Sequence, residues 1–135
     1  GKKSVLQGVP KSLPAIVKAF RIQEKVRGVG FDWDNKGQVW DKVLEEIEEL
    51  KTEVEIGNQN RIESEFGDVL FALINYSRFI NVNPEDALER TNKRFMERFL
   101  IMEGLIKKDN LELSDMNLKE MDLYWNKSKN IHLSD

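Results

Sequence analysis

The sequence predicts an all-α fold, and two observations support this prediction. Apolar residues recur at helical spacing in several segments, and no segment alternates convincingly with the period of two that is typical of a β-strand. The 135 residues include 8 Gly and only 3 Pro, so long helices are not interrupted. The length suits one compact domain with a core and is too short for two comfortable ones.

The N-terminal part is expected to contain an arm and one helix. Residues 1–11 look like a linker or N-terminal arm, and residues 12–135 are assigned to a single domain. Ser12 is the expected N-cap of the first helix, whose apolar residues follow helical spacing. The stretch from Gly28 to Gly30 ends this helix. A short loop with two aromatic residues, Phe31 and Trp33, follows.

The next two helices are expected to be joined by a tight turn. The second runs from about Gln38 to Glu55, and Gly57 with Asn58 turns the chain. The third covers roughly Gln59 to Asn81, and its segment Val69–Ile74 is apolar all round. A helix of this kind is expected to be buried on every side. In a chain this small, that suggests burial against a second subunit.

Two further helices complete the expected fold. The segment Asn83-Pro84-Glu85-Asp86 is a strong helix start, with a cap residue, a proline at the first position and acids in the first turn. This fourth helix continues to about Lys108. Asn117 and Glu120 resemble a capping box for a last short helix.

Composition excludes several classes of function. The net charge of −3 argues against a general nucleic-acid-binding surface, so no stable nucleic-acid partner is expected. The chain has no cysteine, which excludes disulfides, zinc–thiolate sites and thiol catalysis. His132 is the only histidine, so a His-based dyad or a His-rich metal site is not expected. No apolar run approaches the roughly 20 residues of a membrane span. No signal peptide is visible, so we expect a cytoplasmic protein; because the chain begins at Gly1, we expect a fragment or a processed form.

Acidic residues on the second and third helices form a candidate metal site. Glu46 and Glu49 lie on the same flank of the second helix, and Glu45 lies one turn before Glu49. Taken alone, this segment would more often be a solvated acidic face. Glu65 and Asp68 lie three residues apart on the third helix, and Asp68 adjoins the apolar run, where we expect it to be buried. Two antiparallel helices would bring these acids to a shared groove.

Four acids in one groove repel each other, and a divalent cation would relieve the repulsion. Ligands with oxygen alone favour Mg²⁺, or Mn²⁺, over zinc. Di-iron sites in helical bundles need Glu-x-x-His pairs, which this chain lacks. The alternative for Asp68 is a charge balanced by a neighbouring Arg or Lys.

Basic residues nearby are candidates for phosphate binding. Arg94 and Arg98 lie one turn apart on the fourth helix and would suit a polyphosphate clamp, although such a pair is often an ordinary surface feature. Lys42 and Arg61 lie one turn before Glu46 and Glu65, so they would either reach a phosphate or form local salt bridges. On the last helix, Trp125 and Lys129 lie one turn apart. We expect Trp125 either to be a packing residue or to stack on a base.

The pattern Glu45-Glu46-x-x-Glu49, fifteen spacer residues and Glu65-x-x-Asp68 resembles the signature of the MazG nucleotide pyrophosphohydrolases. The flanking segments Val29–Trp33, Gly67–Ala72 and Asn92–Phe95 agree with it. The resemblance covers about Pro10 to Lys129 and is to the C-terminal half of two-domain MazG proteins, which would account for the missing initiator Met.

This resemblance implies an all-α fold that works as a homodimer, with a four-helix core at each active site. It implies Mg²⁺-dependent hydrolysis of nucleoside triphosphates to the monophosphate and pyrophosphate. Glu46, Glu49, Glu65 and Asp68 match metal ligands, and Glu45 matches an acid that holds or activates the water. The positions that match nucleotide contacts are Lys42, Arg61, Arg94, Arg98, Trp125 and Lys129; Arg94 stands where a Lys is expected.

Two alternatives stay open. A helical interaction or regulatory module that kept the fold and lost the chemistry is the rival class, although all four ligand positions are filled. An enzyme restricted to one modified nucleotide is the other, because the sequence does not settle base or sugar preference.

Overall fold

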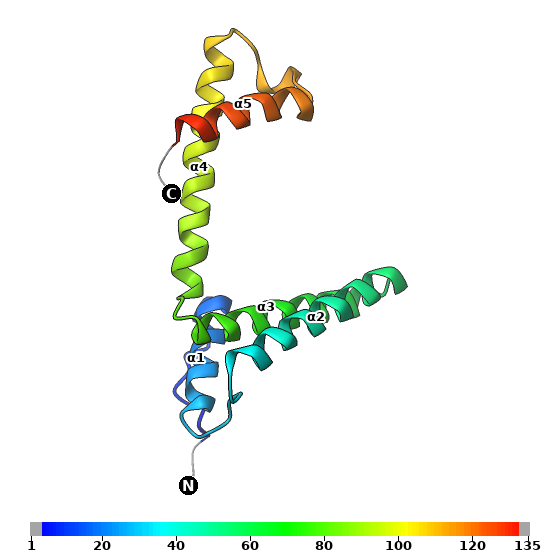
Figure 1. The fold of residues 1–135 in the computed structure, drawn as a ribbon, viewed down its shortest axis with the longest axis vertical. Coiled ribbons are helices and arrows are strands. Elements are labelled where there is room, and N and C mark those ends of the chain that lie inside the picture. Colours follow the sequence, from blue (N-terminus) through cyan, green and yellow to red (C-terminus); the bar gives the residue numbers. More distant parts are fainter. Residues whose placement is uncertain (1–3, 133–135) are drawn as a thin grey trace. The chain divides into compact units, whose positions relative to one another are not determined.

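A computed structural model describes residues 4–132 and confirms the all-α prediction. Within these residues there is no strand, and the helices are α1 (Ala15–Arg27), α2 (Lys36–Ile56), α3 (Gln59–Phe79), α4 (Pro84–Lys108), the short 3₁₀ helix η1 (Leu113–Asp115) and α5 (Leu118–Ile131) (Figure 1). The chain divides into two compact units, one up to Ala87 and one from Leu88. The single domain at 12–135 and the arm at 1–11 stay predictions, and residues 1–3 and 133–135 lie outside the described part.

The expected cap of the first helix was wrong. α1 begins at Ala15, and its N-cap is Pro14, which makes no side-chain cap hydrogen bond. The reason is that Pro14 disfavours the helical conformation for the residue before it, so the helix cannot start from Ser12. The end is as predicted: α1 stops at Arg27, and Gly30 adopts φ 91°, a backbone conformation that favours glycine.

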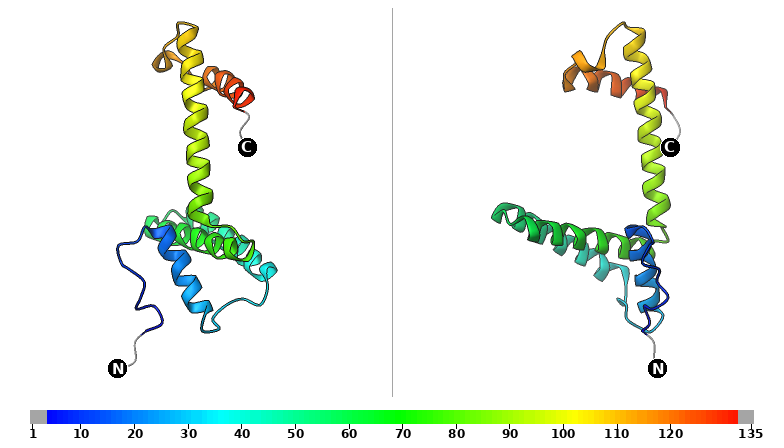
Figure 2. Two further views of the ribbon diagram at one scale, coloured as in Figure 1. Left: turned by 90° about the vertical axis from the view of Figure 1, so that its left-hand side faces the viewer. Right: turned by 180° about the vertical axis from the view of Figure 1, so that it is seen from behind.

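α2 and α3 form a hairpin, as expected, and run side by side in Figures 1 and 2. The Asn35 side chain caps α2 by accepting a hydrogen bond from the Gln38 backbone N–H at 3.0 Å, so the helix starts slightly earlier than predicted. Gly57, at φ 88°, ends α2 in the left-handed conformation. The Asn58 side chain then caps α3 by accepting from the Arg61 N–H at 3.2 Å.

The core of the first unit lies between α2 and α3. Its buried apolar side chains are Val39, Val43, Ala72 and Ile74. The prediction that the segment Val69–Ile74 is buried on every side was wrong for a single chain, because Leu70, Phe71 and Leu73 are each more than 40% exposed. Within this unit only α1 and α2 make substantial contact with α3, so the rest of its surface stays uncovered.

In the second unit, α5 contacts α4 through aromatic side chains and the turn after α4 through a hydrogen bond. The Phe95 and Trp125 rings lie 5.2 Å apart, and the Tyr124 hydroxyl donates a hydrogen bond to Asp109 at 2.6 Å. The capping box of Asn117 and Glu120 is present as predicted. So is the start of α4, where the Asn83 side chain accepts from the Glu85 and Asp86 N–H groups.

Of the helices described in residues 4–132, none is both long and apolar enough to cross a membrane.

Candidate metal centre

The α2–α3 hairpin brings the predicted acids together in two overlapping groups. The first group takes one carboxylate oxygen from each of Glu46, Glu65 and Asp68, and these three oxygens lie within 4.8 Å of one another. In the second, oxygens of Glu45, Glu46 and Glu49 do the same. Glu46 belongs to both groups and is therefore the centre of the acidic cluster. The cluster arises because i, i+3 pairs on two antiparallel helices face a common groove.

Two oxygens of this cluster are buried without a hydrogen-bond partner. Glu46 is only 7% exposed, yet its Oε2 accepts no hydrogen bond from the described residues, and the same holds for Oε2 of Glu65. An unsatisfied buried carboxylate oxygen is costly, so such atoms mark a missing positively charged or donating partner. The donor set therefore fits a hard divalent cation, which takes oxygen ligands.

The fold makes one carboxyl of this cluster titrate close to neutral pH. Burial, a hydrogen bond with Glu46, and repulsion by Glu49, Glu46 and Asp68 raise the pKa of Glu65 to about 7. Burial acts to raise the pKa of Glu46 as well, but the hydrogen bond and charge of Lys42 outweigh it and lower that pKa below its ordinary value. The pKa values of these two neighbouring carboxyls therefore differ. Glu65, with the higher pKa, is the one that binds a proton.

Lys42 makes local salt bridges, one of its two predicted roles. Its Nζ lies 3.0 Å from Oε1 of Glu46 and 3.4 Å from Oε1 of Glu45. The hydrogen bond with Glu46 is the main reason that the pKa of Lys42 is raised. In this structure the ammonium group therefore supplies the positive charge beside Glu46.

Asp68 differs from its expected environment. We expected it to be buried, but it is exposed, because the apolar surface that comes after it on α3 is uncovered in the single chain. No ion pair joins Asp68 to a Lys or Arg within residues 4–132, so the alternative of a charge balanced by a basic neighbour finds no partner there.

The remaining predicted contacts divide between the two units. Arg61 is exposed on α3, one turn before Glu65. The other four belong to the second unit, so their approach to the carboxylates stays a prediction; they are Arg94, Arg98, Trp125 and Lys129. Within that unit, Arg98 donates to Nδ1 of His132 at 3.3 Å, and Trp125 packs on Phe95.

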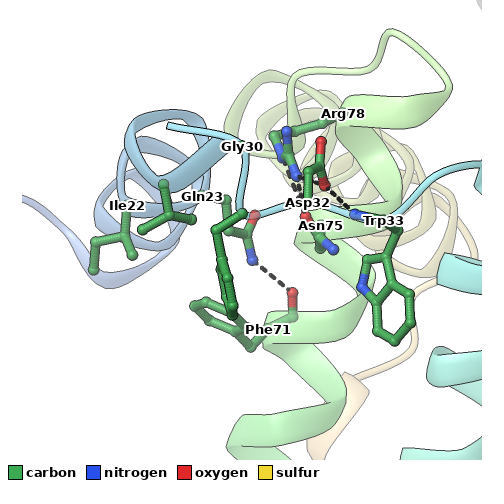
Figure 3. Close-up of a pocket in the computed structure, with 10 residues that line it drawn as sticks. Ile22, Gln23, Gly30, Asp32, Trp33, Phe71, Asn75 and Arg78 are labelled. Atoms are coloured by element: carbon green, nitrogen blue, oxygen red, sulfur yellow. Dashed lines mark hydrogen bonds and ion pairs between the residues drawn. The ribbon is translucent and has the colours of Figure 1, made fainter. Parts of the chain in front are cut away.

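A cavity that the sequence did not predict lies beside the cluster. A hollow of about 300 Å³ contains Lys42, Glu46 and Asp68 together with Trp33 and Asn75. A larger one of about 480 Å³ adjoins it and extends to Gln23 and Arg78 (Figure 3). The signal was readable in part, since Gln23 continues the apolar spacing of Ile16 and Phe20 on α1, where a polar residue is unusual.

Known proteins are similar to most of this chain. Residues 37–99, which contain the whole acidic cluster, match the MazG nucleotide pyrophosphohydrolase domain. The nucleoside triphosphate pyrophosphohydrolase/pyrophosphatase MazG of Thermotoga maritima is 44% identical over 128 residues, which are 95% of this chain and 49% of that protein. The nucleoside triphosphate pyrophosphohydrolase of Escherichia coli K12 is 38% identical over 128 residues, 93% of this chain and 49% of that protein. The uncharacterized protein YabN of Bacillus subtilis is 45% identical over 129 residues, 95% of this chain and 26% of that protein.

This chain thus spans about half the length of the first two relatives, and the matched domain carries the acids that the hairpin brings together. Residues 37–99 of this chain therefore match a MazG nucleotide pyrophosphohydrolase domain, and nearly the whole chain is similar to about half of each of those two relatives.

Proposed function

We propose that this chain hydrolyses nucleoside triphosphates to the monophosphate and pyrophosphate, with Mg²⁺ held by the acidic cluster. The observation that supports this most is the pair of buried, unpartnered carboxylate oxygens on Glu46 and Glu65. They belong to a group of three acids inside the segment that matches the pyrophosphohydrolase domain. The names of the Thermotoga maritima and Escherichia coli relatives add independent support.

In this proposal the ligands are Glu46, Glu49, Glu65 and Asp68. All donate oxygen only, which favours Mg²⁺ and also suits Mn²⁺. When bound, such an ion supplies Lewis acidity, neutralising charge on phosphoryl oxygens and acidifying water. Glu65 gives up its proton to become a full ligand, since its pKa lies near neutrality.

The other residues act on water and phosphate. Glu45, exposed at the edge of the cluster, holds or activates the attacking water. Lys42 lies beside Glu46 and turns its charge toward a phosphate once that carboxylate is engaged. Arg94 and Arg98 stabilise the pyrophosphate leaving group through charge-assisted hydrogen bonds. The further nucleotide contacts proposed are Arg61, Trp125 and Lys129.

A homodimer forms part of the proposal. The first unit exposes two apolar stripes, each at i, i+4, i+7 spacing: Trp40, Leu44 and Ile47 on α2, and Phe66, Leu70 and Leu73 on α3. Contiguous apolar surface of this extent is uncommon on a protein that stays monomeric. A second copy offers the same two stripes, so an isologous contact would cover both. The cytoplasmic location and the absence of a stable nucleic-acid partner stay predictions.

Release of pyrophosphate tests the proposal directly. Purified chain is incubated with a panel of nucleoside triphosphates, with Mg²⁺ or with EDTA. Release is expected with Mg²⁺ alone, and Asp68→Asn is expected to abolish it. Glu63→Gln is the matched control, because this exposed acid lies on the same helix but in neither carboxylate group. A folded chain that releases no pyrophosphate from any nucleotide at saturating Mg²⁺ would instead be the interaction module.

A further inference from the structure

An imidazole ring joins the end of α5 to the middle of α4. His132 follows α5 as its C-cap, and its side chain is only 10% exposed. On one side of the ring, Nδ1 accepts a hydrogen bond from Nε of Arg98 at 3.3 Å. On the other side, Nε2 lies 2.7 Å from Oε2 of Glu97. Both partners belong to α4, which α5 crosses (Figure 1). His132 therefore contacts an arginine that is proposed to stabilise the leaving group.

The partners of His132 determine which ring nitrogen carries the proton. Nε of an arginine carries a hydrogen and can only donate, so Nδ1 of His132 is the acceptor. The protonated nitrogen is then Nε2, and its N–H donates to the Glu97 carboxylate. Both ring nitrogens are therefore engaged. The three side chains form one directed chain of hydrogen bonds, from the Arg98 guanidinium through the ring to Glu97.

Glu97 and Arg98 need a third residue to be linked in this way. They are consecutive on α4, so their side chains point about 100° apart around the helix and do not face each other. His132 contacts both of them from α5. A carboxylate that accepts from one ring nitrogen fixes the orientation of an imidazole, as it does for many metal-binding histidines. In this chain the oriented ring acts on a guanidinium instead.

Packing of α5 on α4 fixes the position of the ring. Trp125, Ser128 and His132 have i, i+3 and i+7 spacing, so they share one face of α5. The Trp125 ring packs on Phe95, and Ser128 is fully buried. The backbone N–H of His132 donates to the carbonyl oxygen of Ser128 at 2.8 Å. The backbone of His132 is therefore attached to a buried turn of α5, and its ring is held against α4.

The hydrogen bond to Nε restricts the guanidinium of Arg98. A guanidinium is planar, with the Nε–H on one edge and the terminal nitrogens at its end. Holding Nε limits rotation about the last bonds of the side chain, a freedom that an arginine otherwise loses when it binds a ligand. The terminal nitrogens, which form the fork that binds a phosphate in a bidentate way, are then presented in one orientation.

We propose that His132, oriented by Glu97, is a positioning residue that holds the Arg98 guanidinium in place for the pyrophosphate group of the substrate. The inference rests on the proposed function, in which Arg98 contacts that group. It gives a role to the only histidine of the chain. The simpler interpretation is a tether that joins α5 to α4. A tether would act on the whole of α5, whereas a positioning residue acts through Arg98.

Pyrophosphate release from nucleotides and binding of inorganic pyrophosphate, both with Mg²⁺, are measured in matched variants. His132→Leu removes both ring nitrogens, whereas His132→Asn keeps an acceptor and a donor. His132→Leu is expected to lower kcat/KM about tenfold, mainly through kcat, and to weaken pyrophosphate binding by a similar factor. His132→Asn is expected to restore both to within about twofold of the unaltered chain. Tyr124→Phe, which removes the hydrogen bond between Tyr124 and Asp109, is the matched control for a tether and is expected to change neither.

A second set of variants carries Arg98→Ala as well. In that background His132→Leu is expected to change kcat/KM by less than about twofold, because the residue through which it acts is gone. Equal losses in both backgrounds, or a His132→Asn variant no better than His132→Leu, would show that His132 is only a tether. If His132→Leu does not fold, Glu97→Ala replaces it, since Glu97 is exposed and its loss leaves the ring present. A smaller loss in the same direction is then expected, again absent with Arg98→Ala, and no loss rejects the positioning role.

The outcomes separate this role from the hydrolysis. One result rejects the hydrolysis and keeps the positioning role: no nucleotide releases pyrophosphate, yet His132→Leu weakens binding of inorganic pyrophosphate and Tyr124→Phe does not. Pyrophosphate release with the same kcat/KM in His132→Leu and Glu97→Ala keeps the hydrolysis and rejects the positioning role. A folded chain that neither releases nor binds pyrophosphate overturns both.

Discussion

Replacement of Glu65 by glutamine removes the carboxyl group whose pKa the fold raises to about 7. Its pKa rises from an ordinary value of 4.5 to about 7, chiefly through burial and through the hydrogen bond with Glu46. Because the folded-state pKa lies above the ordinary value, the metal-free fold gains stability from this group at low pH and loses that contribution as the pH rises through about 7. Binding of a divalent cation requires the ionised form, so it releases the proton.

This pKa sets the size of the effect. With a pKa of about 7, the ionised fraction of Glu65 is about a tenth at pH 6 and about nine tenths at pH 8. The apparent affinity for Mn²⁺ is therefore expected to rise about tenfold between pH 6 and pH 8. In Glu65→Gln the affinity is lower at every pH, because a ligand is lost, and its slope over this range disappears.

Calorimetric titration with Mn²⁺ at pH 6, 7 and 8 measures both quantities. Repeating each titration in buffers of different ionisation enthalpy counts the protons released, and the count is expected to fall toward zero at pH 8. Glu63→Gln controls for the loss of one acid on α3 and is expected to keep the tenfold rise. An affinity that stays constant from pH 6 to pH 8 in the unaltered chain, or an equal rise in Glu65→Gln, would refute this account of the cluster.

Three further expectations concern another acid of the cluster, the arginine pair of α4 and the assembly of the chain. Asp68→Asn should abolish turnover and leave the protein folded, since it relieves repulsion in the metal-free cluster; circular dichroism and a pyrophosphate assay check this, and full Mg²⁺-dependent activity would contradict the ligand assignment. Arg98→Ala should lower kcat/KM by about one to two orders of magnitude and leave Mn²⁺ affinity nearly unchanged; normal turnover would show that the Arg94 and Arg98 pair is only a surface feature. Sedimentation should give a homodimer, and a stable folded monomer at micromolar concentration would exclude the proposed assembly.

Most of the fold could be predicted because short-range chemistry decides where these helices begin and end. Asn83 and Asn117 cap their helices as the sequence indicated, and Gly57 ends α2 in the left-handed conformation. The prediction for the start of α1 was wrong, because the restriction imposed by Pro14 outweighed the capping tendency of Ser12. The predicted burial of Leu70 and Leu73 was wrong for another reason. Periodicity shows that a surface is apolar but not what covers it.

The candidate site was predictable only where its residues share helix faces. The spacing within each acid pair, together with the hairpin, was enough to anticipate that Glu46 and Glu65 meet. The cavity was not predictable, because it depends on contacts between segments far apart in sequence. Gln23 meets the carbonyl of Phe71, and Arg78 reaches back to Asp32; neither partner can be deduced from a local pattern.

The turn between α2 and α3 makes chain length itself part of the chemistry. Gly57 ends α2 and Asn58 caps the start of α3, so the two helices that carry the acids are joined without additional loop residues. One residue inserted early in α3 would rotate the rest of that helix by about 100° and advance it by about 1.5 Å. Glu65 and Asp68 would then turn away from Glu46, although every residue of the motif would still be present. Insertions and deletions are therefore expected to be tolerated in the segment before α1 but not in this hairpin. The number of residues in its spacer fixes how the two halves of the site face each other.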